Sequence, residues 1–324
     1  MIPENPMLGE VCGNEQLRSE LLTALGENRL PHSLLLVGEA GCGTGHAARC
    51  LAADYLFPAG GQAARNTADG KLTQIDEDGD LVTGIIREVL NVRPVGKMNQ
   101  INVKQIRAAR SECFQSSLSS DGRVVLIQGA DRMHPSAANA LLKVLEEPPE
   151  GVLFLLTAGS QAAVLPTIRS RCSVYAVSPV PVSVCTQVLL QKNSSLPPAQ
   201  AAFLSQMFAG RIGSCLRAQQ PDRRAVLEKA AALYGYLAKG SEYEALVLLA
   251  GFEKEKASIG LLKDLSDMCA AALRDASFCV PGQAAMQPAL AARCIEGAAD
   301  AARRISANAN PKLVLTLLAA ELCL

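Results

Sequence analysis

Three short stretches of the sequence are almost entirely apolar: SLLLVG at 33–38, VVLIQG at 124–129 and VLFLLT at 152–157. Their apolar residues are continuous and do not alternate with polar ones, which is typical of strands buried on both faces of a parallel sheet. Parallel strands require crossover connections, and right-handed strand–helix–strand units build an open α/β sheet. The three runs therefore predict an α/β fold for the first half of the chain.

The helical patterns lie between and after these runs. The clearest is HPSAANALLKVLEEPP, where Pro148 and Pro149 end the pattern. Its apolar residues recur at helical spacing and form one stripe: Ala138, Leu141, Leu142 and Leu145. By contrast, residues 58–81 show no apolar periodicity, and we interpret them as a surface insertion or loop.

The pattern changes near SPVPVS at 178–183, beyond which the sequence predicts helices and no strand. Short helices are expected over 184–217, and the last segment, NPKLVLTLLAAELCL, is apolar almost all round, as in a helix buried on several sides. We therefore predict three domains: an α/β domain at 1–177, a small helical domain at 178–220 and an all-helical domain at 221–324.

Composition restricts the classes of function. Apolar residues make up 49% of the chain, yet no run approaches the roughly 20 residues needed to span a bilayer. The N-terminal MIPENPMLGEV has no basic segment followed by an apolar run, so we expect no secretory signal. A cytoplasmic protein is the expectation. With 31 basic and 31 acidic residues the net charge is zero, so any nucleic-acid contact requires a local basic patch.

The cysteines and histidines do not indicate a metal site. The 11 cysteines are scattered, without a C-x-x-C pair, and the 3 histidines are equally dispersed. We expect buried, reduced cysteines that pack as small apolar residues, and no metal.

The segment GEAGCGTGHA at 38–47 follows an apolar run and precedes a helical pattern, as a phosphate-binding loop does. In the pattern G-x-x-x-x-G-K-[ST], Gly38 and Gly43 are present and Gly41 lies between them, but Thr44 replaces the lysine and Gly45 the Ser/Thr. Thr44 supplies no ammonium group for the β- and γ-phosphates, and Gly45 no oxygen for Mg²⁺. Either the glycines simply permit the turn or the loop retains weak anion binding; hydrolysis here is not expected.

The second apolar strand shows the same loss. A nucleotide-hydrolysing protein places acidic residues at the end of this strand, whereas this chain has Gln128 and Gly129. Asp131 comes later and is interpreted as a helix N-cap or a polar loop residue. The segment LPTIRSRC at 165–172 adds two arginines, Arg169 and Arg171, in a polar break that a solvated turn would also explain.

Four segments together closely resemble one family: ENRLPHSLLLVGEAG, INVKQIRAARSE, VVLIQGADRMHPSAANALLKVLEEPPEGVLFLLTA and VLPTIRSRC. The family is that of the delta-prime subunits of bacterial DNA polymerase III clamp loaders, within the AAA+ fold. The resemblance is clear over residues 8–178 and looser beyond. It implies an AAA+ domain, a helical lid at 178–220 and a C-terminal collar for oligomerisation at 221–324.

The resemblance also implies a role for the Ser-Arg-Cys motif, Ser170, Arg171 and Cys172. Delta-prime-type subunits do not hydrolyse ATP but present this arginine to the nucleotide of an adjacent subunit. Arg171 is thus the expected trans-acting arginine finger, ATP and Mg²⁺ are bound by neighbours, and this chain requires no cofactor. The implied partners are gamma/tau-type ATPases, a delta subunit, the sliding clamp through the complex, and primed DNA.

Two further expectations accompany the resemblance. Many relatives carry a four-cysteine zinc module that residues 51–112 lack, since they contain no cysteine. Lys104, Arg107 and Arg110 recur every three residues and are candidates for contacts to the DNA backbone, although a solvated helix face explains them equally well.

Two rival functions remain at this point. One is an active gamma/tau-type AAA+ ATPase, and the other is an AAA+-like scaffold unrelated to replication. We expect no intrinsic ATPase activity. The chain would then be part of an enzyme only as a subunit of the DNA polymerase III complex that the resemblance implies.

Overall fold

The structure, a computed structural model, describes residues 6–96, 98–114, 122–252 and 254–323. Two parts of the sequence discussed above lie outside this description. They are residues 1–5, which belong to the N-terminal segment inspected for a secretory signal, and the side chain of Cys323. The chain divides into two compact units, one ending at Pro179 and one beginning at Val180. The finer boundaries at 177 and 220 stay predictions.

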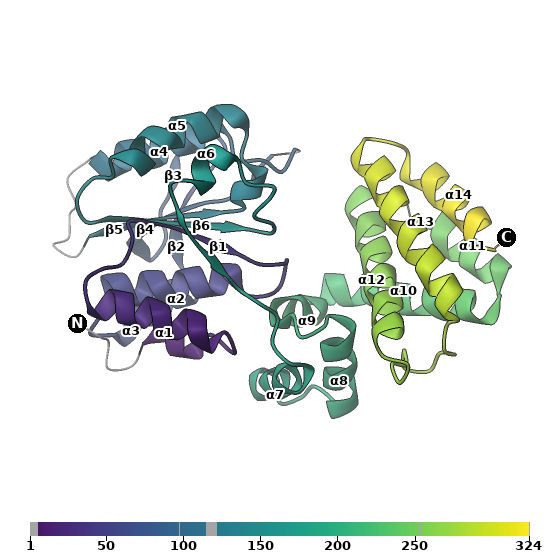
Figure 1. The fold of residues 1–324 in the computed structure, drawn as a ribbon. Coiled ribbons are helices and arrows are strands. Elements are labelled where there is room, and N and C mark those ends of the chain that lie inside the picture. The colour runs from purple at the N-terminus through teal and green to yellow at the C-terminus, as the bar shows by residue number, and fades with distance from the viewer. Residues whose placement is uncertain (1–5, 97, 115–121, 253, 324) are drawn as a thin grey trace. The chain divides into compact units, whose positions relative to one another are not determined.

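The three apolar runs form strands, as predicted, and further strands join them in one sheet (Figure 1). The strands are β1 (Ser33–Val37), β2 (Leu72–Ile75), β3 (Leu81–Val82), β4 (Ile86–Val92), β5 (Arg123–Gln128), β6 (Val152–Ala158) and β7 (Ser173–Ala176). Across the described residues their order is β3-β2-β4-β5-β6-β1-β7. All neighbours are parallel except β2 and β3. The prediction of a largely parallel α/β sheet is confirmed.

Helices cover both faces of the sheet. They are α1 (Glu15–Gly26), α2 (Thr44–Leu56) and α3 (Gly61–Ala68) on one face, and α4 (Val103–Phe114), α5 (Pro135–Glu146) and α6 (Pro166–Arg169) on the other. Alternate residues of β1 serve the two cores: Leu34 and Leu36 pack with α2, whereas Leu35 packs with α4 and α5. The sheet therefore determines the distance between the glycine-rich loop that follows β1 and the Ser-Arg-Cys motif, residues 170–172, that follows α6.

The interpretation of residues 58–81 as a surface loop is wrong. This segment contains α3 and β2, and Ala64, Ala68, Leu72 and Ile75 are buried. The pattern was weak because α3 buries small residues and β2 carries Thr73, a polar residue that is itself buried and donates to the carbonyl of Ile86 at 3.0 Å.

The C-terminal unit is helical throughout its described residues, as predicted. Its helices are α7 (Val182–Lys192), α8 (Pro198–Met207), α9 (Ile212–Ala218), α10 (Pro221–Lys239), α11 (Glu242–Ala250), α12 (Glu255–Arg274), α13 (Pro288–Ser306) and α14 (Pro311–Cys323). One expectation fails in part: α14 buries Leu315 and Leu318 but leaves Leu313 71% exposed. Within this unit, α14 is therefore covered on one side, and its open side mixes leucines with polar residues.

Most described cysteines behave as predicted. Cys50, Cys113, Cys185, Cys215, Cys269 and Cys294 are buried, whereas Cys12, Cys42 and Cys172 are half-buried and Cys279 is exposed, contrary to expectation. No helix among the described residues is both long and apolar enough to cross a membrane.

Candidate functional site

The loop after β1 turns sharply into α2 because it uses glycine where other residues are strained. Gly41 and Gly43 have φ angles of 99° and 100°, and Gly43 is the N-cap of α2. Gly38 has a different role. A Cβ added there would lie 2.3 Å from the carbonyl oxygen of Val177, at the end of β7. The first glycine thus lets two neighbouring strands end in close contact, which is a packing role and needs no phosphate.

The space that a phosphate loop keeps for magnesium is lined here by other side chains. A Cβ at Gly45 would lie 3.7 Å from Nη1 of Arg49 and 3.8 Å from Nε2 of Gln128. Gln128 Nε2 is buried without a hydrogen-bond partner. The lysine position holds Thr44, the Ser/Thr position holds Gly45, and Gln128 stands where a carboxylate is needed, so these residues do not fit a magnesium–nucleotide complex.

Arg49 does not replace the missing lysine. Its Nε donates to the carbonyl of Ala68 at 2.9 Å, which directs the side chain toward α3. Burial lowers the pKa of Arg49, and the charge of Arg93 lowers it further. The guanidinium is thus bound within the fold and does not lie free above the loop.

The strand end after β5 is equally unsuited to hydrolysis. Gly129 has a φ of 86° and lies against Arg132 and Pro94. Asp131, in the 3₁₀ turn Ala130–Arg132, accepts a hydrogen bond from the amide of Gly159 at 3.3 Å. Its carboxylate therefore stabilises the turn after β6, which is the polar loop role considered from the sequence.

The Ser-Arg-Cys motif is anchored by contacts with the hydrophobic core. Ile168 in α6 is fully buried, and Cys172 packs on the same core. Burial raises the pKa of the Cys172 thiol to about 11, so it is protonated at neutral pH. Ser170, the C-cap of α6, donates its hydroxyl to the carbonyl of Thr167 at 3.2 Å. The backbone on either side of Arg171 is thus held by the buried Ile168 and the half-buried Cys172.

Arg171 itself lies at the surface, with 32% of its side chain exposed. Its Nε donates to Glu146 Oε1 at 2.8 Å, its Nη2 donates to the same oxygen, and its Nη1 donates to the carbonyl of Thr167 at 2.9 Å. The guanidinium is therefore ordered on the outside of the N-terminal unit.

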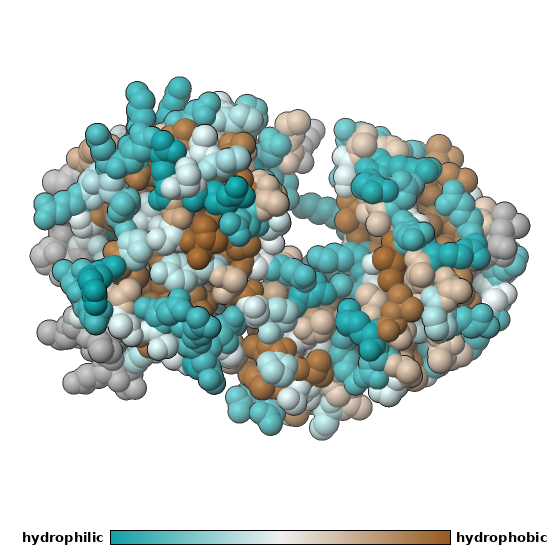
Figure 2. All heavy atoms as spheres, in the orientation of Figure 1, coloured by the Kyte–Doolittle hydropathy of each residue, from teal (hydrophilic) through white to brown (hydrophobic). Residues whose placement is uncertain are grey.

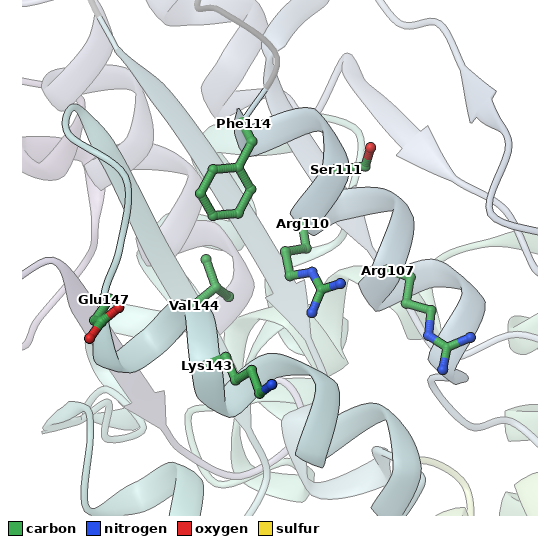
Figure 3. Close-up of a pocket in the computed structure, with 7 residues that line it drawn as sticks. All are labelled: Arg107, Arg110, Ser111, Phe114, Lys143, Val144 and Glu147. Atoms are coloured by element: carbon green, nitrogen blue, oxygen red, sulfur yellow. The ribbon is translucent and has the colours of Figure 1, made fainter.

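The basic residues of α4 do not act as one row. Arg107 and Arg110 line a groove of about 620 Å³ between α4 and α5, together with Lys143 and Phe114 (Figure 3). Lys104 instead forms an ion pair with Asp78 at 2.9 Å. Lys143 and Phe114 were not among the predicted candidates. Phe114, 64% exposed, was detectable because it lies four residues after Arg110 and seven after Arg107, on the same face of the helix.

The helical unit exposes apolar side chains on α11 and α14, two helices that pack against each other. They are Tyr243, Leu246 and Val247 from α11 and Leu313 and Leu317 from α14. We call this set the α11/α14 surface. Figure 2 shows apolar residues interspersed with hydrophilic ones on the surface of this unit. Exposed apolar side chains on two helices that pack together are typical of a protein–protein contact.

Comparisons with known proteins bear on these features. A family model described as "DNA polymerase III, delta subunit" matches residues 13–181. The chain is 33% identical over 208 residues to the DNA polymerase III subunit delta' of Pseudomonas aeruginosa, covering 64% of this chain and 60% of that relative. It is 30% identical over 177 residues to the subunit gamma/tau of Mycobacterium bovis, covering 51% of this chain and 28% of that one. The match thus spans less than two thirds of either relative.

Among solved structures, a DNA polymerase III gamma subunit-related protein from Thermotoga maritima covers 93% of this chain and 97% of its own, at 19% identity and a TM-score of 0.54. At this identity the similarity concerns the fold alone. Together with the sheet and the helical unit, it confirms the AAA+ fold class with helical domains.

Proposed function

The chain belongs to the DNA polymerase III delta-subunit family, as a clamp-loader subunit of the delta-prime type, and from this membership we propose that it is a non-hydrolysing subunit that supplies Arg171 to a neighbour's ATP. One contrast carries the proposal. Arg171 is anchored at the surface of the unit, whereas the loop at Thr44 and Gly45 lacks the groups that bind a triphosphate and magnesium. The chain retains an arginine for catalysis without a nucleotide site of its own.

The chemistry of guanidinium fits this role. Its planar set of N–H donors matches the oxygens of a phosphate, and its charge opposes the charge that develops on the γ-phosphate. Arginine fingers of this kind accelerate hydrolysis by roughly 10³- to 10⁵-fold. The degenerate loop is then retained because Gly38 allows β1 and β7 to pack, and β7 directly follows the motif.

The proposed partners are gamma/tau-type ATPase subunits and a delta subunit, with the sliding clamp reached through the complex. The α11/α14 surface supports assembly, because its apolar side chains would be buried by another subunit, as a collar requires. Such a hetero-oligomer would act in DNA replication in the cytoplasm.

Contact with primed DNA is proposed through the groove between α4 and α5. Arg107, Arg110 and Lys143 line it with a single acidic residue, Glu147, so the groove has an excess of positive charge in a chain of zero net charge. Contacts to phosphates would depend on salt and not on sequence. Lys104 contributes less, since Asp78 already neutralises it.

The experiment compares reconstituted loaders that differ at Arg171. With Arg171→Ala we expect intact assembly by size-exclusion chromatography and a fall of at least 10³-fold in the finger-dependent hydrolysis rate. Arg169→Ala, two residues away, is the matched control and should retain the wild-type rate. Equal hydrolysis by the Arg171→Ala and wild-type assemblies would refute the assignment.

The two rivals predict different results. An active ATPase would hydrolyse ATP as an isolated chain, even after Arg171→Ala. A scaffold unrelated to replication would fail to associate with gamma/tau-type or delta-type subunits.

A further inference from the structure

Arg171 is bonded within its own chain through all three guanidinium nitrogens. Nε and Nη2 donate to Glu146 Oε1, and Nη1 donates to the carbonyl of Thr167 and lies 3.4 Å from the Ser170 hydroxyl. Glu146 is the last residue of α5, 25 residues before Arg171 in the sequence. The carboxylate thus neutralises the charge that a finger needs and occupies two of its donors.

We propose that Glu146 is a positioning residue that holds Arg171 in a resting conformation and releases it when a neighbour's triphosphate competes for the guanidinium. We call the contact between the two side chains the resting pair. The proposal rests on the function proposed above, since a release step has meaning only for an arginine that acts in trans.

Charge determines which partner the guanidinium prefers. A triphosphate carries several negative charges and presents its oxygens in the geometry that arginine binds best. The Glu146 carboxylate carries one charge and repels an approaching phosphate. The two anions therefore compete, and the guanidinium cannot keep its resting contacts while it binds the γ-phosphate fully.

The resting pair is weak enough to open. The side chains of Arg171 and Glu146 are 32% and 48% exposed, so water screens their attraction. An exposed pair of this kind shifts an equilibrium by about two- to five-fold. The free energy needed to open the pair therefore lowers the activity at limiting ATP without preventing hydrolysis.

Only the side chain has to move. The buried Ile168 and the half-buried Cys172 hold the backbone on both sides of Arg171 by packing on the core, and the resting pair takes no part in these contacts. Rotation about side-chain bonds is sufficient to break the contact with Glu146. The motif stays in place while the guanidinium changes partner.

The test uses Glu146→Gln in the reconstituted assembly, which removes the carboxylate's charge and retains its shape. The measurement is kcat/KM for ATP hydrolysis. We expect it to rise by about two- to five-fold, because the guanidinium no longer has to leave an anionic partner. Glu150→Gln, a loss of an exposed carboxylate four residues further along, is the matched control and should leave kcat/KM unchanged.

A merely structural ion pair gives the opposite result. If the pair only held α6 against α5, Glu146→Gln would leave kcat/KM unchanged or lower it, and either outcome would overturn the proposal. Combination with Arg171→Ala adds a second criterion: the gain from Glu146→Gln must disappear in the double variant, because Glu146 acts through Arg171.

The same set of variants separates this proposal from the function on which it rests. If Arg171→Ala leaves hydrolysis unchanged, the finger itself is wrong. If Arg171→Ala abolishes stimulation while Glu146→Gln equals wild type, the finger stands and the resting pair is refuted.

Discussion

Alanine at two glycines of the degenerate loop should have opposite effects on stability. Gly38 and Gly45 both belong to the phosphate-loop pattern, but their surroundings differ. A Cβ at position 38 would lie 2.3 Å from the Val177 carbonyl oxygen, inside the 3.0 Å that real Cβ contacts respect. A Cβ at position 45 would meet its nearest neighbours at 3.7 Å and 3.8 Å, which is ordinary contact.

The magnitudes follow from these distances. Val177 is 3% exposed, and its amide donates to the carbonyl of Val37 at 2.7 Å, so its backbone is held on both sides. Gly38→Ala therefore forces β1 and β7 apart and should cost about 1–3 kcal/mol, as overpacking does. Gly45 lies in the first turn of α2, where alanine is the better helix former and should gain up to about 1 kcal/mol.

Hydrogen exchange followed by mass spectrometry is the appropriate assay, because it reports on individual segments of a chain with two compact units. Gly38→Ala should lower the protection of β1 and β7 by about 5- to 150-fold. Gly45→Ala should leave that protection unchanged or raise it. The explanation would be refuted if β1 and β7 were as protected in Gly38→Ala as in wild type, or if Gly45→Ala lost as much protection as Gly38→Ala. In either case the packing of β7 would not explain why position 38 is glycine.

Further predictions concern charge. Burial raises the pKa of Asp54 to about 6, so the contribution of its protonated carboxyl group to stability is full below pH about 4 and is lost as the pH rises to about 6. Asp54→Asn should remove this pH dependence from the free energy of unfolding, measured with urea across that range. Arg223→Ala should destabilise the helical unit by about 2 kcal/mol in the same assay at pH 7, because Asp264, 1% exposed, loses its ion pair. Arg107→Ala should weaken binding of the assembled loader to primed DNA and reduce the slope of log K against log salt by about 1, as measured by fluorescence anisotropy; an unchanged slope would exclude a phosphate contact there.

The sequence predicted the buried parallel strands well and the polar ones poorly. β1, β5 and β6 are continuous apolar runs, and hydrophobicity alone identifies them. β2 and β4 were missed because each buries a polar residue. Asn91 in β4 is fully buried and pairs with Gln74 of β2 at 2.8 Å, a contact between neighbouring strands that no pattern within either strand reveals.

The candidate site shows the same division. Arg171 was found because its motif is contiguous in the sequence, but Glu146 was not, since the pair forms only when α6 packs against the end of α5. Lys143 was missed for the same reason: it reaches the groove of Arg107 and Arg110 from a different helix. Partners that are distant in sequence require the tertiary structure.

The most direct measurement of the central claim is ATP turnover by three samples: the purified chain alone, a gamma/tau-type ATPase assembly lacking it, and the two combined. We predict no turnover by the chain alone and strong stimulation on mixing, which the Arg171→Ala chain fails to provide although it still assembles. Sustained turnover by the isolated chain, or equal stimulation by the Arg171→Ala chain, would contradict the account.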